Sequence, residues 1–321
     1  MVAPIGEVRR FLCDALCSVG ASYDSAVQLA DVLVDADYKG HYSHGLNRIE
    51  LYIRDVKKKL CDPDAKPFIL KETPSTAWVD GKGGFGPVVG NFCMELAIQK
   101  AKNVGVGWVA ANHSNHFGIA GWYSRLALQH GMLGMSFTNT SPVVSPTRAK
   151  TIEVQRRKGE PIVHGWAQDA EGLSTTDAVV ALKTLCLMPL GGPEITSGYK
   201  GYGLSLMVET LCGVLSGSSI GPDIRLWHES AEEGPNLGQC FIAIDPQCFA
   251  PGFEDRMSSI MDYLRGMEPA DPSKPVLVPG DPERNHMQMV DEQGGIRYHE
   301  NQLEASVKLA AELGIRPMKL L

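Results

Sequence analysis

The chain has 321 residues, of which 44% are hydrophobic and 21% are charged, so it can bury a sizeable core and is expected to form two globular domains or a large one with an appendage. Its net charge is −7 and no run of Lys/Arg is longer than the three residues Lys57-Lys58-Lys59, which excludes an extended cationic surface for nucleic acid or an anionic membrane. The composition therefore favours small molecules or other proteins as partners.

The first residues lack the pattern of a secretion signal. Glu7, Arg9 and Arg10 fall where a signal peptide needs an unbroken apolar stretch, and no uncharged run elsewhere is long enough to span a bilayer. The eight cysteines are scattered and contain no Cys-x-x-Cys pair. We therefore expect a cytoplasmic protein with buried free thiols rather than disulfides or a zinc site.

The chain begins with a region of helical periodicity. Apolar residues recur at helical spacing over 7–20, 25–40 and 46–59, and Ser22 is a candidate cap for the second helix. The second and third helices are separated by the polar interruption HYSHG at 41–45.

From about residue 76 the pattern changes to short strands that alternate with helices. This alternation predicts a mixed α/β layer, although the connections leave open whether the sheet is parallel. A polar segment at 227–238 is predicted to be a loop. The expected strands are 75–81, 104–112, 132–140 and 240–246, and the expected helices are 90–103, 121–131, 204–217 and 301–314.

The stretch VDGKGGFG at 79–86 contains a G-x-G-x-x-G between a predicted strand and a predicted helix. With 34 glycines in 321 residues, this spacing arises by chance about 0.4 times per chain, so its context must decide. A dinucleotide-binding βαβ unit needs an acidic residue at the end of its second strand, and here that strand ends in Ala111 and Asn112. We therefore interpret the glycines as a strand-to-helix turn and not as a Rossmann site.

Four polar clusters lie in or beside glycine-containing turns. Ser43-His44-Gly45, with Arg48 one turn later, gathers a hydroxyl, an imidazole and a guanidinium, which suits an anionic substrate that exchanges a proton. The other clusters suit phosphate recognition through hydroxyls, helix-start amides and a lysine. They are residues 112–118, 139–142 and 198–203.

Each cluster also has a purely structural interpretation. A histidine near a helix start is often a cap or a satisfied core residue, Arg48 fits a solvated helix face with Arg54, and residues 198–203 fit a flexible turn. A structural role is favoured for His41, His113 and His164. A four-histidine metal site from 41, 44, 113 and 116 lacks a carboxylate or cysteine at matching spacing, so we expect no metal.

Several blocks of the sequence, in order from about residue 7 to the C-terminus, resemble the malate/L-lactate dehydrogenase family. This family includes L-sulfolactate dehydrogenase, ureidoglycolate dehydrogenase and diketogulonate reductase. The blocks are GHYSHGLNRIELYIRDV, ANHSNHFGIAGWYS, SFTNTSPVVSPT, QRRKGEPIVHGWAQDAEGLSTTD, GYKGYGLSLMVE and PVLVPGDPE.

The resemblance implies an oxidoreductase that uses NAD or NADP to interconvert a small 2-hydroxy acid, malate- or L-lactate-like, and its 2-keto acid. It also implies a mixed α/β, non-Rossmann fold with a largely antiparallel sheet flanked by helices. A helical substrate and dimerisation domain is expected from 1–72 with 285–321, an NAD(P)-binding domain from 73–284, and a homodimer as the assembly. Neither the particular acid nor the choice of cofactor follows from these blocks.

The resemblance also assigns roles to individual residues. His44 matches the proton donor of the family, Ser43 a relay beside it, and Arg48 the group that holds the substrate carboxylate. His116 matches a histidine assigned to acid/base work in some members and to the cofactor in others, and we expect His44 to be the acid in ketone reduction. The positions matching cofactor contacts are His116, Gly118, Thr140, Ser141, Lys200, Pro279, Gly280 and Asp281.

The sequence departs from the family pattern after Lys150. Members of the family continue through a strand and a turn that contribute cofactor contacts and, in some members, an aspartate for the Ser-His relay. Here Thr151 joins directly to IEVQRRKGEP, so several dozen residues are absent. Two hypotheses follow: a 2-hydroxy-acid dehydrogenase, or a catalytically impaired, splice-like variant that acts only as a dimerisation partner.

Overall fold

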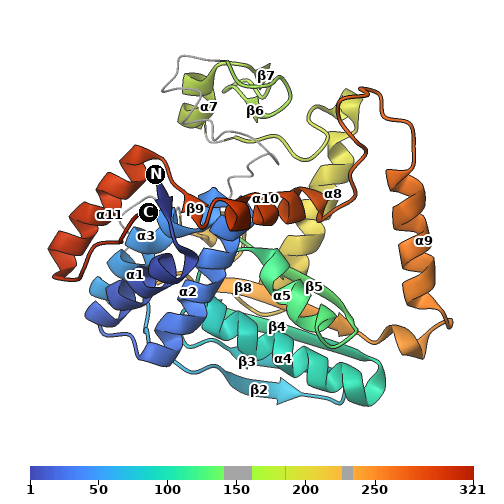
Figure 1. Cartoon of the computed structure of the whole chain (residues 1–321). Helices are drawn as coiled ribbons and strands as arrows, with labels where there is room; N and C mark the ends of the chain where they lie inside the picture. Colours follow the sequence, from blue (N-terminus) through green and yellow to red (C-terminus); the bar gives the residue numbers. More distant parts are fainter. Residues whose placement is uncertain (141–160, 185, 226–233) are drawn as a thin grey trace.

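The computed structural model describes residues 1–140, 161–184, 186–225 and 234–321 of the chain. Within these ranges, helices from both chain ends lie together, beside a five-stranded sheet with its own covering helices (Figure 1). The predicted mixed α/β fold with a largely antiparallel sheet is confirmed. The predicted domain boundaries, 1–72 with 285–321 and 73–284, stay a prediction.

The helical part is built from the first and the last residues of the chain. Its core joins side chains of both ends, including Leu12, Leu33 and Leu309. Strand β1 (Val2–Ala3) pairs antiparallel with β9 (Ile296–Arg297), so the two ends also share backbone hydrogen bonds. The helices are α1 (Ile5–Ser18), α2 (Tyr23–Tyr38), α3 (Ile49–Lys57), α10 (Asp281–Glu292) and α11 (Glu300–Leu313).

The local sequence explains why these helices form. In α1 the buried positions 8, 11, 12, 15 and 16 recur at helical spacing, so one face is apolar. Ser22 caps α2 as predicted, because its side chain accepts a hydrogen bond from the backbone amide of Ser25. The sequence thus indicates the start of α2 and the buried face of α1.

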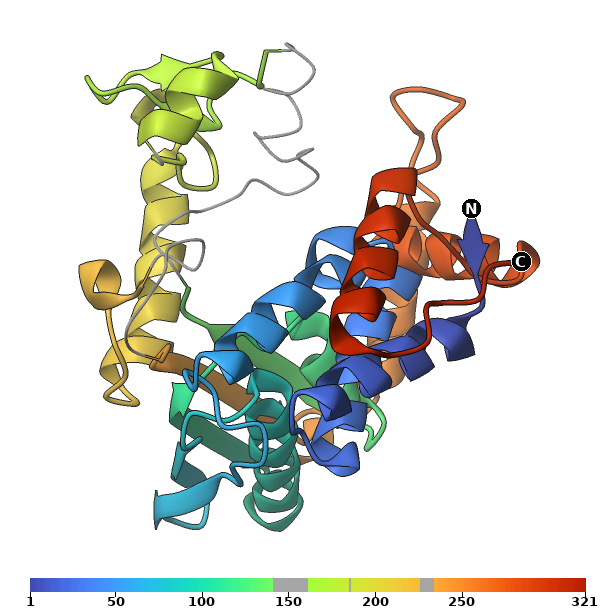
Figure 2. The same cartoon turned by 90° about the vertical axis from the view of Figure 1, so that its left-hand side faces the viewer.

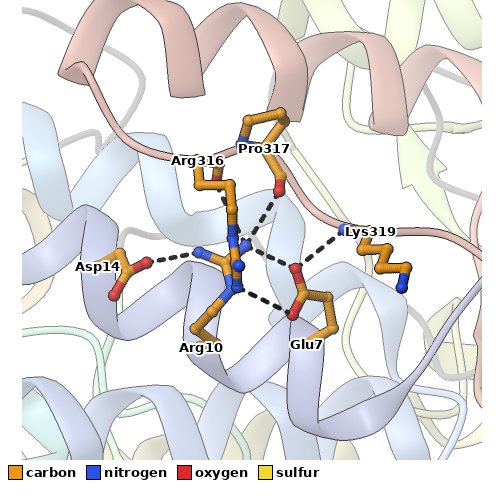
Figure 3. Close-up of polar contacts among 6 residues, drawn as sticks. All are labelled: Glu7, Arg10, Asp14, Arg316, Pro317 and Lys319. Carbon is orange, nitrogen blue, oxygen red and sulfur yellow. Dashed lines mark hydrogen bonds and ion pairs between the residues drawn. The ribbon is translucent and has the colours of Figure 1, made fainter.

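Polar contacts fasten the C-terminal tail to α1 (Figure 3). The Arg10 guanidinium donates to the carbonyls of Arg316 and Pro317 at 3.2 and 3.0 Å, and to the carboxylate of Glu7 at 2.7 Å. The amide of Lys319 donates to the same carboxylate at 3.0 Å. Because a hydrogen bond to its ionised form favours that form, Arg10 lowers the pKa of Glu7.

The central sheet has the strand order β2-β3-β4-β8-β5. Every neighbouring pair is antiparallel except β3 and β4, which are parallel and are connected through helix α4. This is the only parallel pair of the five-stranded sheet, so no doubly wound nucleotide-binding sheet is present in the described residues. The elements are β2 (Phe68–Glu72), β3 (Thr76–Asp80), α4 (Gly86–Val104), β4 (Val106–Ser114), α5 (Ala120–Leu128), β5 (Leu133–Thr138) and β8 (Leu237–Ile244).

Two apolar layers cover the two faces of this sheet. Phe241 and Ala243 of β8 belong to the cluster that α4 and α5 complete. The alternate residues Cys240 and Ile242 face the other side, where they meet Cys212 of the π-helical segment η4 (Thr210–Val214). The alternation of β8 residues between two buried layers is the two-residue period of a strand that is covered on both faces.

Helix α9 (Phe253–Arg265) stands away from these layers, whereas α8 (Gly198–Glu209) rises from the second layer, which it meets near its C-terminal end through Val208 (Figures 1 and 2). The expected helix over 204–217 begins earlier, inside the glycine-rich stretch, and continues into η4. Sequence periodicity did not identify β2, α9 or α10. A small unit that precedes α8 in the chain comprises β6 (Ala167–Gln168), β7 (Ser174–Thr175) and α7 (Ala178–Thr184), and it lies at the top of Figures 1 and 2, away from the sheet.

The glycine-rich stretch 79–86 forms the turn between β3 and α4. Gly81 and Gly83 donate backbone hydrogen bonds to the carbonyls of Asn112 and His113 at 2.9 and 2.7 Å. A Cβ atom on Gly86 would lie 2.1 Å from the carbonyl oxygen of His116, which leaves no room for a side chain. The third glycine thus allows the start of α4 to pack against the backbone that carries His116.

We expect Gly86→Ala to destabilise the protein by about 1 to 3 kcal/mol, because the methyl group must displace backbone atoms. In the first turn of α5, Gly121 has open space around its Cβ position, so Gly121→Ala should be neutral or stabilising by up to about 1 kcal/mol. Urea unfolding of both variants measures the difference. Equal effects of the two substitutions would contradict the close packing at Gly86.

Candidate active site

The segment between α2 and α3 is a pair of short 3-10 turns. The first turn comprises Tyr42–His44 and the second comprises Leu46–Arg48, with Gly45 between them. A Cβ atom on Gly45 would lie 1.8 Å from Oδ1 of Asp37, so this position requires glycine. The chain therefore presents Ser43, His44 and Arg48 on a tight turn that lies directly against α2.

Asp37 lies beneath this turn and is fully buried. Its Oδ2 atom accepts hydrogen bonds from the Leu46 amide at 2.8 Å and from the Tyr298 hydroxyl at 2.7 Å. Its Oδ1 atom has no hydrogen-bond partner among the described residues. Burial raises the pKa of this carboxyl group from its ordinary value of 3.8 to about 7, against the effect of the two hydrogen bonds.

His116 follows β4 and is held by contacts on several sides. Its backbone amide donates to Oδ1 of Asn115 at 2.7 Å, and the Tyr52 hydroxyl lies 2.6 Å from its Nδ1 atom. The amide of Gly118 donates to the same Nδ1 at 3.3 Å. Because Nδ1 accepts a hydrogen bond, the proton of the neutral ring is on Nε2.

The rings of His44 and His116 are stacked, with centroids 5.5 Å apart and planes inclined by 21°. Ser43 Oγ lies 2.7 Å from Nδ1 of His44, which leaves Nε2 as the nitrogen that can contact a substrate. The Arg48 side chain donates through Nε to the carbonyl of Ser43. The structure thus brings together four predicted residues from two distant parts of the sequence: Ser43, His44, Arg48 and His116.

Burial and neighbouring positive charge set the protonation states of this group. Burial, then Arg48, lowers the pKa of His44 to about 4. Burial, then His44 and Arg48, lowers the pKa of His116 to about 3. Both imidazoles are therefore neutral at neutral pH and lie beside a guanidinium, an arrangement that attracts an anion and lets a neutral ring accept or donate a proton.

The predicted cofactor contacts are more dispersed. Thr140 is exposed after the end of β5, and Lys200 is exposed in the first turn of α8. The amide of Gly118 contacts His116, and its φ of +79° with Val32 2.3 Å from the Cβ position requires glycine. Ser141 lies outside the described residues.

Pro279 and Gly280 precede α10, and Asp281 begins it. The carboxylate of Asp281 accepts from the amide of Val278 at 2.9 Å and is ion-paired with Arg265 and Arg284, so its charge is already compensated within the chain. Figures 1 and 2 together show α8 and α10 on different sides of the molecule. Within one chain, the helix that carries Lys200 therefore lies apart from the helix that Pro279 and Gly280 precede.

The four histidines considered as a metal site do not converge. His41 contacts Glu283 at 3.5 Å, and His113 contacts Asp80 at 3.1 Å. The described ranges contain no group of three or more histidine, cysteine or acidic side chains arranged to hold a metal ion. In the same ranges, no helix has the length and apolar character needed to cross a bilayer.

Three residues that support the site were not identified from the sequence: Asp37, Tyr52 and Tyr298. Asp37 lies four residues after Leu33, on the face of α2 that is otherwise apolar, and an acidic residue at such a position is unusual. Tyr52 is one helical turn after Arg48, on the buried face of α3. Tyr298 carries no comparable signal, because its contact with Asp37 spans 261 residues of sequence.

The sequence model of the malate/L-lactate dehydrogenase family matches residues 4–151 and 149–305 of the chain. L-sulfolactate dehydrogenase from Methanocaldococcus jannaschii is 36% identical and is aligned over 96% of either chain. Ureidoglycolate dehydrogenase (NAD(+)) from Escherichia coli is 29% identical, with 83% of each chain covered. The relatives thus act on different 2-hydroxy acids.

Solved structures give the same result. Malate dehydrogenase from Pyrococcus horikoshii superposes with a TM-score of 0.87 at 30% identity and covers 99% of this chain and 97% of its own. Malate dehydrogenase from Entamoeba histolytica superposes with a TM-score of 0.90 at 28% identity, covering 98% of this chain and 99% of its own. The fold is therefore that of these dehydrogenases over nearly its whole length.

The similarity is interrupted where the sequence predicts missing residues. The family match divides at 149–151, and the alignment to the sulfolactate dehydrogenase has 343 positions, more than the 321 residues of this chain, so it opens gaps in this chain. The join itself lies outside the described residues. None of these similarities supports the alternative of an impaired chain that acts only as a dimerisation partner.

We expect neither His44 nor His116 to become protonated above about pH 5, because burial and Arg48 oppose the charged form. In the folded protein the pKa values of both rings lie below the ordinary 6.5. The two histidines therefore do not reduce the free energy of unfolding above pH 6.5, and the protein loses stability as the pH falls from 6.5 toward the folded pKa values, about 4 for His44 and about 3 for His116. Histidine ring signals in carbon–proton NMR spectra, assigned with His44→Gln and His116→Gln, measure the midpoints. A midpoint near 6.5 for either ring would contradict the described environment.

Proposed function

Because this chain belongs to the malate/L-lactate dehydrogenase family and is thus a dehydrogenase, we propose that it interconverts a small 2-hydroxy acid and its 2-keto acid with NAD or NADP. The observation that supports the proposal most strongly is the stacked pair of neutral imidazoles beside Arg48. Within the site, His44 and Arg48 place a proton-transfer group and an anion-binding group about one turn apart in the chain.

Arg48 binds the substrate carboxylate in this proposal. A guanidinium forms two parallel hydrogen bonds with a carboxylate, which fixes the orientation of the acid as well as its charge. The neighbouring carbon, C2, then lies beside the two imidazoles. A 2-hydroxy or 2-keto acid has its reacting carbon next to its carboxylate, so the substrate class matches the short sequence separation of His44 and Arg48.

His44 transfers the proton of the substrate oxygen. In the oxidation direction, neutral His44 accepts the hydroxyl proton through Nε2 while Ser43 remains at Nδ1. In the reduction direction, binding of the carboxylate compensates the charge of Arg48, which otherwise lowers the pKa of His44. Substrate binding thus raises that pKa and favours uptake of the proton that His44 gives to the oxygen on C2.

His116 remains the rival proton donor. Its Nδ1 is occupied by Tyr52 and Gly118, so Nε2 carries the proton and can donate to the carbonyl oxygen of a keto acid. We assign it the role of holding and polarising that oxygen. The difference between the two histidines is that only His44 has a hydroxyl on the same turn as a route for proton exchange.

The exposed donors at two predicted positions fit a nicotinamide dinucleotide. The ammonium of Lys200 and the hydroxyl of Thr140 are hydrogen-bond donors of the kind that phosphate oxygens need. Asp281 contributes through its backbone alone, since its carboxylate is bound by Arg265 and Arg284. When bound, the cofactor supplies or accepts the hydride at C2 of the acid.

A homodimer is part of the proposal because two helices expose apolar faces. No residue of α9 is buried, and Met257, Ile260 and Tyr263 are 44%, 52% and 70% exposed. In α8 only Gly198 and Gly201 are buried. Exposed apolar faces of this extent indicate contacts with another protein. In a two-fold symmetric dimer, a second copy of the chain covers these faces and has its own covered in return.

A cytoplasmic location is also proposed. It is supported by the eight free cysteines, which suit a reducing compartment, and by the implied nicotinamide cofactor.

The catalytic assignment predicts distinct effects of three substitutions. His44→Gln should lower kcat by about 100- to 1,000-fold with the best substrate of a panel of 2-keto acids, assayed with NADH and with NADPH. His116→Gln should have a smaller effect on kcat, and His41→Gln, on the same turn but in contact with Glu283, should leave turnover close to wild type. Near wild-type turnover of His44→Gln would reject His44 as the proton donor.

The proposed dimer predicts that a charge on the apolar face of α9 weakens association. Ile260→Glu should shift the protein toward monomer in sedimentation velocity at micromolar concentration, because a carboxylate would be desolvated in the contact. Ser259→Glu introduces the same charge beside this face, at an exposed position, and serves as the control. A monomeric wild type, or equal effects of both substitutions, would contradict the assignment of α9 to the interface.

A further inference from the structure

Asp37 is an acid placed where an acid is unfavourable. It is fully buried in the apolar face of α2, and among the described residues no cationic side chain is paired with it. Burying a carboxyl group without a compensating charge lowers the stability of the folded protein unless hydrogen bonds offset that cost. The groups that donate those hydrogen bonds therefore indicate what the carboxyl group holds in place.

Those groups are the backbone of the turn that carries His44 and the C-terminal segment. Oδ2 accepts from the Leu46 amide, and Oδ1 lies against Gly45. On the other side, Oδ2 accepts from the Tyr298 hydroxyl. Asp37 thus joins a residue two positions after His44 to a residue near the opposite end of the chain.

Tyr298 is itself held in place. Its amide donates to the carbonyl of Met1 at 3.0 Å, beside the β1–β9 pair. Its ring meets Tyr42 edge-on, with centroids 6.1 Å apart, and Tyr42 meets His286 of α10 in the same way at 5.6 Å. The C-terminal segment therefore braces the turn at two points, through Asp37 and through Tyr42.

The turn needs such a brace because the site is assembled across two parts of the molecule. His44 belongs to the helical part, whereas His116 follows strand β4 of the sheet. The stacking of the two rings depends on the placement of a short 3-10 turn rather than on a long helix. A displacement of about 1 Å in a catalytic group can lower the rate about 100-fold.

We propose that Asp37, oriented by Tyr298, is a positioning residue for the reaction: its hydrogen bond to Leu46 holds the Ser43–Arg48 turn so that His44 stays stacked on His116. The proposal rests on the proposed function for its effect on turnover. Its effect on the conformation of the turn is independent of that function.

The test compares two Tyr→Phe substitutions that each remove one hydroxyl–carboxylate contact between α2 and the C-terminal region. Tyr298→Phe removes the contact with Asp37. Tyr38→Phe, at the next position of α2, removes the contact with Asp291 of α10, whose two distances are 2.8 and 2.9 Å. Hydrogen–deuterium exchange of peptides covering residues 41–48 and steady-state kinetics are measured for both variants.

We expect Tyr298→Phe to increase deuterium uptake over 41–48 and to lower kcat by about 10-fold or more, and Tyr38→Phe to change neither. Asp37→Asn keeps a carbonyl acceptor for Leu46 and should stay within about 3-fold of the wild-type kcat, whereas Asp37→Leu, which removes the acceptor, should lose at least as much as Tyr298→Phe.

Equal uptake and equal kcat for Tyr298→Phe and Tyr38→Phe would overturn the proposal, as would wild-type kcat for a folded Asp37→Leu. If the wild-type chain itself shows no turnover with any keto acid, the proposed function fails instead. The uptake comparison then still decides whether Asp37 and Tyr298 hold the turn.

Discussion

The stacking of His44 on His116 is the contact on which the rest of the site depends. One ring is carried by the helical part, the other by a loop at the end of β4, and neither element alone forms a site. Each ring has its own support. The first rests on Asp37 through the Leu46 amide, and the second is held by Tyr52 and by the close approach of α4 that Gly86 permits.

The electrostatics of this contact explain why an acid is a suitable substrate. Burial and the charge of Arg48 lower the pKa values of the two imidazoles. Both rings therefore stay neutral at neutral pH, and the guanidinium carries the positive charge of the site. A bound carboxylate compensates that charge and makes proton uptake by His44 more favourable. Binding and proton transfer are therefore coupled through one charge, and a neutral substrate would lack both effects.

Much of the fold and part of the site follow from local sequence. Alternating strands and helices predicted the mixed layer, and the missing acidic residue after 104–112 ruled out a Rossmann site, in agreement with a sheet that has one parallel pair. The polar turns identified Ser43, His44, Arg48 and His116. Asp37 and Tyr298 were missed because their contact joins residues 261 positions apart. Helix α9 was missed although its apolar residues recur at helical spacing, and none of its residues is buried in the part of the chain that the structure describes.

Hydride transfer is the central claim, and isotope transfer tests it most directly. The 321-residue chain would be incubated with NADH or NADPH deuterated at the reactive face of C4, together with each member of a panel of 2-keto acids that includes oxaloacetate and pyruvate, and the products examined by NMR. We expect a 2-hydroxy acid that carries one deuterium at C2, in an amount equal to the cofactor oxidised. No product, or a product without deuterium at C2, would contradict the assignment of this chain as a working 2-hydroxy-acid dehydrogenase.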